Sequence, residues 1–329
     1  MSQFTWFVRG VLASWGILAG SLAFAWRFRQ GQRTPLSKRR RQFFKEWPLP
    51  RQPCERGPDR SMTAGQLYDF VQFFEAFIKE RSMYYVCSNI VKPLTEPFQL
   101  SFVELVGPTS IQWFVSHCWG MPVRHFSDAI RKHAQCLDGD WEDSSYWICT
   151  FSNSQWHVKE ELGLGQWQNS SFYLALRSPE CKGTTMIIDE SVLPLQRIWC
   201  LFEVYQTISL SRSEHFHGLL LCTSTGVLQQ GKAGTDVAVA VAKTVAELDT
   251  ENAKASDESD RLMIHKLIES MDGGFDYMNT FVRKTICKAL EASHSHYETT
   301  LKTLMEDLTE THPTLLTSRA NHPETKAGS

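Results

Sequence analysis

The sequence has neither a C-x-x-C pair nor a second histidine at metal-ligand spacing beside His117. Its nine cysteines are scattered, and their number is odd. Several of them, such as Cys149, Cys200 and Cys222, lie inside apolar runs, where a free thiol behaves as a small hydrophobic residue. Neither a zinc site nor a disulfide framework is therefore expected, and a reducing compartment fits this cysteine usage best.

Glycine-rich phosphate-binding loops are also missing. The pair Gly163-Leu-Gly165 lies in an expected loop, without the strand before it and the helix after it that such a motif requires. No segment of the chain repeats another. We therefore expect no P-loop and no repeat architecture.

The first 45 residues contain no acidic side chain. They hold nine of the 34 basic residues, which leaves 25 against all 36 acidic residues in the remainder, a net charge of −11. An acidic body repels a phosphate backbone, so nucleic acid is not expected as a partner.

Phe4 to Trp26 is an apolar segment with aromatic ends, interrupted by Arg9 and a few small polar residues. A helix of this length is about long enough to span a bilayer, and the basic flank from Arg27 to Arg41 places the following residues in the cytosol. We therefore expect a single-pass membrane protein whose C-terminal domain is cytosolic. An import signal for the mitochondrion or plastid is the alternative, because such signals are also acid-free and rich in arginine.

Beyond a linker rich in proline, apolar residues at helical spacing predict a helix from Ser61 to about Glu80. Strands and helices then alternate. Strands are expected at 110–116, 145–150, 184–189 and 219–222, and helices at 126–137, 171–176, 194–210, 237–249, 257–271 and 275–292. Such alternation favours a parallel sheet covered on both faces.

The predicted fold class is thus α/β: a flavodoxin-like parallel sheet of four or five strands with helices on both faces, an N-terminal apolar helix and C-terminal helices. The expected organisation is an apolar helix with a basic flank (1–45), a linker (46–60), a helical lead-in (61–107), an α/β domain (108–292) and a tail that is first helical and then disordered (293–329).

Ligands of open parallel sheets bind at the carboxyl ends of the strands, where the strand order reverses. In the order 2-1-3-4-5 this point lies between strands one and three. The residues that follow these two strands form the candidate site: Ser116, His117, Trp119, Asp189, Arg197, Trp199 and Glu203. Ser116 and His117 do not predict a hydrolytic triad, because adjacent residues of a strand point to opposite faces.

Glu203 is the only charged residue between Ile198 and Leu210. On a helix, Trp199 and Gln196 share its face. A carboxyl group beside aromatic rings and partly removed from water has a raised pKa, as reactive carboxyl groups do. The alternative is a structural glutamate that only accepts hydrogen bonds.

The run Trp199-Cys-Leu-Phe-Glu203-Val resembles the W-C-x-x-E-L motif of Toll/interleukin-1-receptor (TIR) domains, and Phe114-Val-Ser116 is similar to their opening strand. The resemblance covers about half of the chain. The stretch also resembles a group of microbial-eukaryote proteins with S-H-x-W-G and R-I-W-C-x-x-E motifs. Where this chain has Arg197, the TIR loop usually has serine or another small residue.

The TIR resemblance implies cleavage of the bond between nicotinamide and ribose in NAD, with Glu203 as the catalytic residue. It implies no cofactor, since NAD would be the substrate. Trp119 or Trp147 would stack on a ring of the nucleotide, and Arg197 would meet a phosphate.

The leading hypothesis is therefore a membrane-anchored TIR-like signalling domain that binds NAD or a related nucleotide and, as a glycohydrolase, cleaves it through Glu203. The rival hypothesis is a non-catalytic module that self-associates, in which residues 151–168 would cover Glu203. A third is an organelle-imported protein with a degenerate pocket, processed near Gly31.

Overall fold

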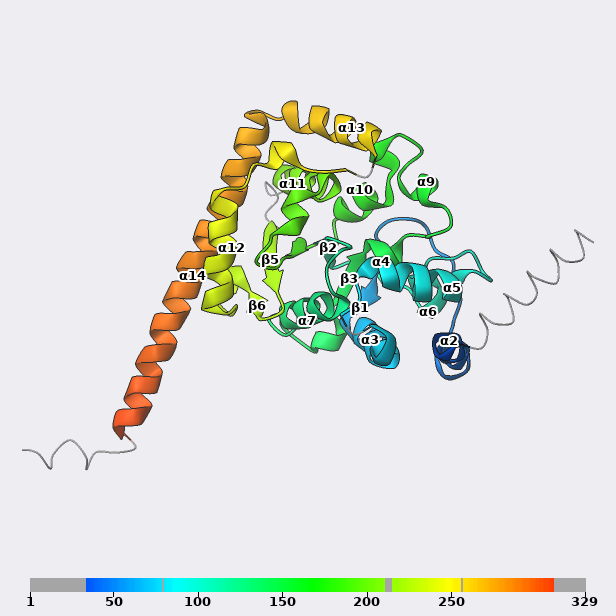
Figure 1. The fold of residues 1–329 in the computed structure, drawn as a ribbon, viewed down its shortest axis with the longest axis horizontal. Coiled ribbons are helices and arrows are strands. Elements are labelled where there is room, and N and C mark those ends of the chain that lie inside the picture. Colours follow the sequence, from blue (N-terminus) through cyan, green and yellow to red (C-terminus); the bar gives the residue numbers. More distant parts are fainter. Residues whose placement is uncertain (1–33, 79, 211–214, 256, 311–329) are drawn as a thin grey trace, which may run out of the picture.

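The computed structural model describes residues 34–310 except 79, 211–214 and 256, and it is an α/β structure built on one six-stranded sheet (Figure 1). The sheet order is β1-β3-β2-β4-β5-β6. The strands are β1 (Met62–Thr63), β2 (Trp113–His117), β3 (Ser145–Ile148), β4 (Thr184–Ile187), β5 (Leu219–Thr223) and β6 (Gly226–Val227).

The sheet is mixed, and the expectation of a purely parallel sheet is wrong. The four central strands, β3-β2-β4-β5, are parallel, whereas β1 and β6 pair antiparallel at the two edges. Each edge strand has only two residues, which is too short for a period-two pattern to be visible in the sequence. β6 follows β5 through a tight turn in which Thr223 Oγ1 accepts hydrogen bonds from the N–H groups of Thr225 and Gly226.

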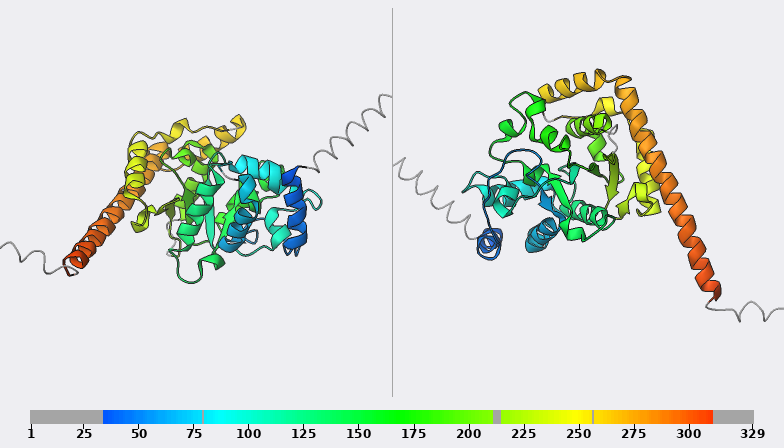
Figure 2. Two further views of the ribbon diagram at one scale, coloured as in Figure 1. Left: turned by 60° about the horizontal axis from the view of Figure 1, so that its bottom comes forward. Right: turned by 180° about the vertical axis from the view of Figure 1, so that it is seen from behind.

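Helices cover both faces of the sheet (Figures 1 and 2). α3 and α7 lie on one face, and α10 and α11 lie on the other. The helices are α2 (Pro35–Glu46), α3 (Ala64–Ile78), α4 (Met83–Val86), α5 (Lys92–Thr95), α6 (Phe102–Val106), α7 (Val123–Ala134), α8 (Cys149–Ser152), α9 (Val158–Glu161), α10 (Ser171–Leu176), α11 (Ile198–Leu210), α12 (Thr235–Ala246), α13 (Glu258–Glu269) and α14 (Gly274–Glu310).

The four central strands and the helices α7, α10 and α11 agree with the sequence prediction to within a few residues at each end, whereas the short helices α8 and α9 between β3 and β4 were not predicted. Alternate residues of β2 explain why a single strand supports two cores. Trp113 and Val115 pack in the core beneath α3 and α7, whereas Phe114 packs with Trp147 on the opposite face. The strands are buried on both faces, as the continuous apolar runs indicate.

The basic segment 38–45 is part of the folded body as helix α2. Thr34 caps this helix, and its Phe43 is fully buried against Phe74 and Phe102. Arg39 lies over the ring of Phe73 and donates a hydrogen bond to its carbonyl oxygen. The lead-in also supplies β1, which pairs with β3, so its residues pack as one unit with the sheet.

α14 is much longer than the predicted helix at 275–292. Its first half packs against α12 and α13, and its last part extends beyond the body (Figures 1 and 2). Among the described residues, no helix is long and apolar enough to cross a membrane. The expected apolar helix at 4–26 and residues 311–329 of the tail, which was expected to be disordered beyond about Leu308, lie outside the described residues; the helix α14 continues to Glu310.

Candidate functional site

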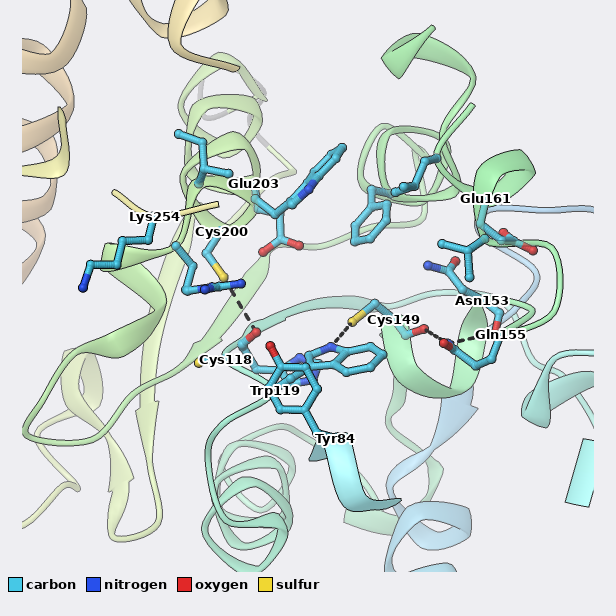
Figure 3. A pocket seen from close by; sticks show the side chains of 17 residues that line it. Tyr84, Cys118, Trp119, Cys149, Asn153, Gln155, Glu161, Cys200, Glu203 and Lys254 are labelled. Atoms are coloured by element: carbon cyan, nitrogen blue, oxygen red, sulfur yellow. Dashed lines mark hydrogen bonds between the residues drawn. The ribbon is translucent and has the colours of Figure 1, made fainter. Parts of the chain in front are cut away.

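A cavity of about 220 Å³ lies at the carboxyl ends of β2 and β3, beside the first turns of α11 (Figure 3). Its lining comes from five parts of the chain: Tyr84 of α4, residues 117–119 at the end of β2, seven residues between Cys149 and Phe172 after β3, residues between Arg197 and Glu203 at the start of α11, and Lys254. The sequence prediction placed the site between strands one and three, which are β2 and β4; the cavity lies at the ends of β2 and β3, and the segment after β4 reaches it through α11.

Glu203 lies on the second turn of α11, with its carboxyl group at the cavity (Figure 3). The helix begins at Ile198 because Arg197 has an extended conformation, which separates α11 from the short 3-10 turn before it. Most neighbouring positions of the helix are apolar and buried. The residue is only 4% exposed, so its carboxyl group depends on the cavity for contact with a ligand.

Burial raises the pKa of the Glu203 carboxyl to about 8, and the nearby Ser116 and Cys200 oppose this shift only in part. Within the described part of the chain, neither Glu203 Oε2 nor Ser116 Oγ has a hydrogen-bond partner. An unpartnered buried carboxyl oxygen costs stability and is rare in proteins. Burial therefore favours the neutral form of Glu203, and its Oε2 is available to a ligand.

β2 places two predicted residues on opposite sides of the sheet. Ser116 lies on the α11 side, near Glu203. The ring of His117 packs 4.7 Å from the ring of Phe126 of α7. Burial lowers the pKa of His117 to about 4, and neither ring nitrogen has a partner among the residues described. A Ser–His pair for nucleophilic attack is therefore absent at this strand end, as the strand alternation predicts.

Aromatic side chains form much of the cavity wall. Trp119 contacts Tyr84 at a ring-centroid distance of 5.5 Å, and its indole N–H donates to Cys149 Sγ at 3.1 Å. Trp199 stacks on Phe172 at 5.6 Å and donates to Asp260. Trp119 and Trp199 thus present ring faces or edges near Glu203. Trp147, the other expected stacking residue, is fully buried against Phe114 and does not line the cavity.

The wall segment, residues 151–168, forms the side of the cavity opposite α11 (Figure 3). Asn153 and Gln155 face the cavity from it, and Asn153 Oδ1 is a second buried oxygen without a partner in the described structure. Glu161 anchors the segment: it accepts hydrogen bonds from Ser154 N–H and Ser171 Oγ and pairs with Arg60 at 2.8 Å. The wall segment therefore encloses the cavity without filling it.

Two basic residues lie at the rim of the cavity, and we call them the rim pair. Arg197 and Lys254 face each other across a parallel β-bridge, in which Lys254 N–H donates to Gln196 O and Ile198 N–H donates to Lys254 O. Both residues line the cavity. The rim pair brings positive charge to the mouth of an otherwise mostly apolar site.

Two predicted site residues do not line the cavity: Ser116, which lies near Glu203, and Asp189, which the fold turns away. β4 ends at Ile187, and the chain then turns so that the Asp189 carboxylate accepts from the backbone N–H and hydroxyl of Ser191. The sequence prediction assumed that the residue just after the third strand faces the site. The turn at 189–192, in which Val192 has a positive φ of 45°, takes it away.

Several lining residues were not predicted from the sequence, namely Tyr84, Cys149, Asn153, Gln155, Phe172 and Lys254. Cys149 directly follows a central strand, so the rule that sites lie at strand ends would have found it. The others come from loops or from helices distant in the sequence, where no pattern marks them.

The described residues contain no group of three or more side chains that could hold a metal ion. No protein-family model, no curated protein and no solved structure matches this chain.

Proposed function

We propose that this chain is a TIR-like domain with a flavodoxin-like central sheet, which binds NAD or a related nucleotide and cleaves its nicotinamide–ribose bond. The observation that carries the proposal is the carboxyl group of Glu203. It is buried, partly unpartnered and directed into a cavity between tryptophan rings at the ends of the strands. The parallel order β3-β2-β4-β5, with its reversal at β2, supports the fold assignment.

The cavity fits one end of such a ligand. Its volume of about 220 Å³ is below the roughly 300–1,000 Å³ of sites for drug-sized molecules, so it suits a single aromatic ring with part of a sugar. Trp119 and Trp199 offer ring contacts to a nicotinamide. Asn153 Oδ1 would accept a hydrogen bond from the carboxamide or from a ribose hydroxyl.

The chemistry requires one carboxylate and no general acid, because nicotinamide leaves as a neutral molecule. The bond between the ring nitrogen and the ribose carbon breaks with both electrons going to the nitrogen. Water then adds its oxygen to the ribose carbon and releases a proton. The transition state resembles an oxocarbenium ion, which an adjacent anion stabilises. Glu203 would supply that anion.

Glu203 must therefore lose its proton when substrate binds. The pyridinium ring of NAD carries a positive charge, and an opposite charge at close range lowers the pKa of a carboxyl group. In this proposal, the substrate itself ionises the catalytic residue, and the empty site keeps it neutral.

The test is NAD consumption by the purified full chain, clustered on beads, beside Glu203→Gln. We expect release of nicotinamide by the wild type and a loss of at least about 100-fold in turnover for the variant, the range found when one transition-state partner is removed. Thermal unfolding of both proteins serves as the folding control. If a folded, clustered wild type releases no nicotinamide, the catalytic part of the proposal is wrong.

A second function, self-association as a signalling scaffold, is favoured by the far end of α14. Tyr297, Leu301, Leu304, Met305 and Leu308 are all exposed there. They continue the buried stripe of Met278, Val282, Ile286 and Ala289 at helical spacing beyond the point where the body covers it. The two functions are compatible, because the cavity and this end of α14 are far apart (Figure 1).

The membrane anchor at residues 4–26 belongs to the proposal as well, with the α/β domain on the cytosolic side. Its support is the apolar segment followed by the basic tract. Fractionation of cells that express the full chain, with carbonate extraction of the membranes, distinguishes an integral protein from one imported into an organelle and processed.

A further inference from the structure

We infer that helix α2 is a lipid-binding surface, whose exposed basic side chains contact anionic headgroups of the membrane and orient the α/β domain on it. The inference rests on the proposed membrane anchor, and it adds the class of ligand and the face that binds it. The observation that carries it is the placement of three basic residues of α2, Lys38, Arg41 and Lys45.

These three residues, which we call the basic stripe, lie along one side of the helix. They are spaced by three and four positions, so they share a face, and all three are exposed. Within the described part of the chain, their side chains have no hydrogen-bond or ion-pair partner. The stripe is therefore free to contact an external anion.

The other side of α2 fixes the helix to the domain. Phe43 is fully buried in the core. The two remaining basic residues of the helix take part in this attachment, because Arg39 donates to Phe73 O at 2.7 Å and Arg40 donates to Asn89 O at 2.8 Å. A surface that binds the basic stripe consequently orients the whole domain.

Charge complementarity favours an anionic membrane that meets the protein through α2. Residues 46–329 hold 25 basic and 36 acidic residues, a net charge of −11, so an anionic surface repels most of the body. Two acidic side chains lie near the helix: Glu46 accepts a hydrogen bond from Gln42, and Glu96 interacts with Arg40. Charges act over only about 8 Å at physiological ionic strength, so the stripe attracts headgroups where α2 itself touches the membrane.

The place of α2 in the chain favours lipid over other acidic partners. Seven residues separate Trp26, at the end of the proposed anchor, from Thr34, which caps α2. A chain extends by at most about 3.6 Å per residue, so α2 begins within about 30 Å of the end of the anchor. α2 and the exposed end of α14 lie on opposite sides of the molecule (Figures 1 and 2). A domain docked through α2 thus directs that end of α14 away from the bilayer.

The experiment uses the full chain reconstituted into phosphatidylcholine vesicles, with and without phosphatidylserine, that contain a lipid with a photoreactive headgroup. We expect residues 34–47 to crosslink at least about tenfold more in the anionic vesicles, because each basic residue near an anionic surface strengthens the contact roughly fivefold. The combined variant Lys38→Gln, Arg41→Gln and Lys45→Gln should lose this difference. Mass spectrometry of the digested protein locates the crosslinks.

The matched control removes the same charge from exposed lysines of α13 and α14, as Lys266→Gln, Lys284→Gln and Lys288→Gln, and should leave the crosslinks unchanged. Thermal unfolding shows whether each variant is folded. Equal crosslinking of residues 34–47 in neutral and anionic vesicles, or an unchanged yield in the stripe variant, overturns the inference.

Carbonate extraction of the same vesicles tests the anchor separately. A chain that carbonate releases, but that crosslinks at α2 only in anionic vesicles, contradicts the anchor and supports the lipid-binding face. A chain that resists carbonate but shows no such crosslinks retains the anchor and refutes the lipid-binding face. Release by carbonate without crosslinks overturns both.

Discussion

At the scale of the residue, ionisation of the buried Glu203 carboxyl lowers the stability of the empty protein. Its pKa is about 8 in the fold because of burial, against an ordinary value of 4.5. A group whose pKa is raised by folding contributes its full stability below the ordinary value and loses it as the pH rises through the folded value. For Glu203 this window extends from about pH 4.5 to pH 8.

The pH dependence of Glu203→Gln follows from that window. The amide keeps the shape of the side chain and cannot ionise. The unfolding free energy of the variant relative to that of the wild type should therefore rise between pH 4.5 and 8, by about 4 kcal/mol in total. Urea unfolding at several pH values measures this difference. Glu291→Gln, on an exposed part of α14, is the control and should show no such trend. A constant difference would mean that Glu203 is already ionised in the empty site.

At the scale of the element, the wall segment is held by one buried cluster of charges. Arg60 pairs with Glu161 of α9 at 2.8 Å and with Glu104 of α6 at 3.2 Å, and all three side chains are largely buried. Glu104 also completes the cap of α6 with Ser101. The cluster therefore joins the lead-in helices to the side of the cavity. It contains two carboxylates and one guanidinium group.

Arg60→Met should leave two buried carboxylates without compensation. Loss of one partner of a buried pair costs about 3–5 kcal/mol, so we expect a loss of this size in unfolding free energy. Hydrogen exchange should also accelerate first in residues 153–162, which the pair anchors. The exposed pair Arg131–Asp128 provides the control, because Arg131→Met should cost less than about 1 kcal/mol. Similar costs for both variants would refute the anchoring role.

At the scale of the whole molecule, buried groups whose pKa values shift in opposite directions act against each other in the pH dependence of stability. Burial lowers the pKa values of His117 and His133 to about 4. A lowered pKa contributes stability above the ordinary value of 6.5 and loses it as the pH falls towards 4. Between about pH 4.5 and 6.5, the stability contributed by the two histidines therefore rises with pH while that contributed by Glu203 falls. Because there are two histidines and one glutamate, the net stability rises in this range.

These three groups predict a maximum of stability near pH 6.5. Below it, each histidine lowers the unfolding free energy by up to about 1.4 kcal/mol per pH unit, and above it Glu203 lowers the free energy by a similar slope. Denaturant unfolding from pH 4 to 8 measures the profile. His133→Gln should flatten its acidic side. A profile that rises steadily to pH 8 would contradict the raised pKa of Glu203.

Assembly is also decided at the scale of the whole molecule. If α14 pairs with a second copy through its exposed stripe, Leu301→Glu with Leu304→Glu should shift the protein to monomers in light scattering at equal concentration. Both residues are about half exposed in the single chain, so folding should be little affected. Lys302→Glu, on the same helix but outside the stripe, controls for added charge. An unchanged mass for the double variant would exclude this surface.

The sequence by itself determined the four central strands and the helices α7, α10 and α11, because continuous apolar runs and helical spacing are local patterns. It also singled out Glu203, since one charge in an apolar helix requires a special environment. The edge strands β1 and β6, the turn that removes Asp189 and the contribution of the wall segment followed only from tertiary structure. These depend on contacts between residues far apart in the chain, which leave no periodic signal. The same is true of Lys254, whose place beside Arg197 results from one β-bridge between segments more than fifty residues apart.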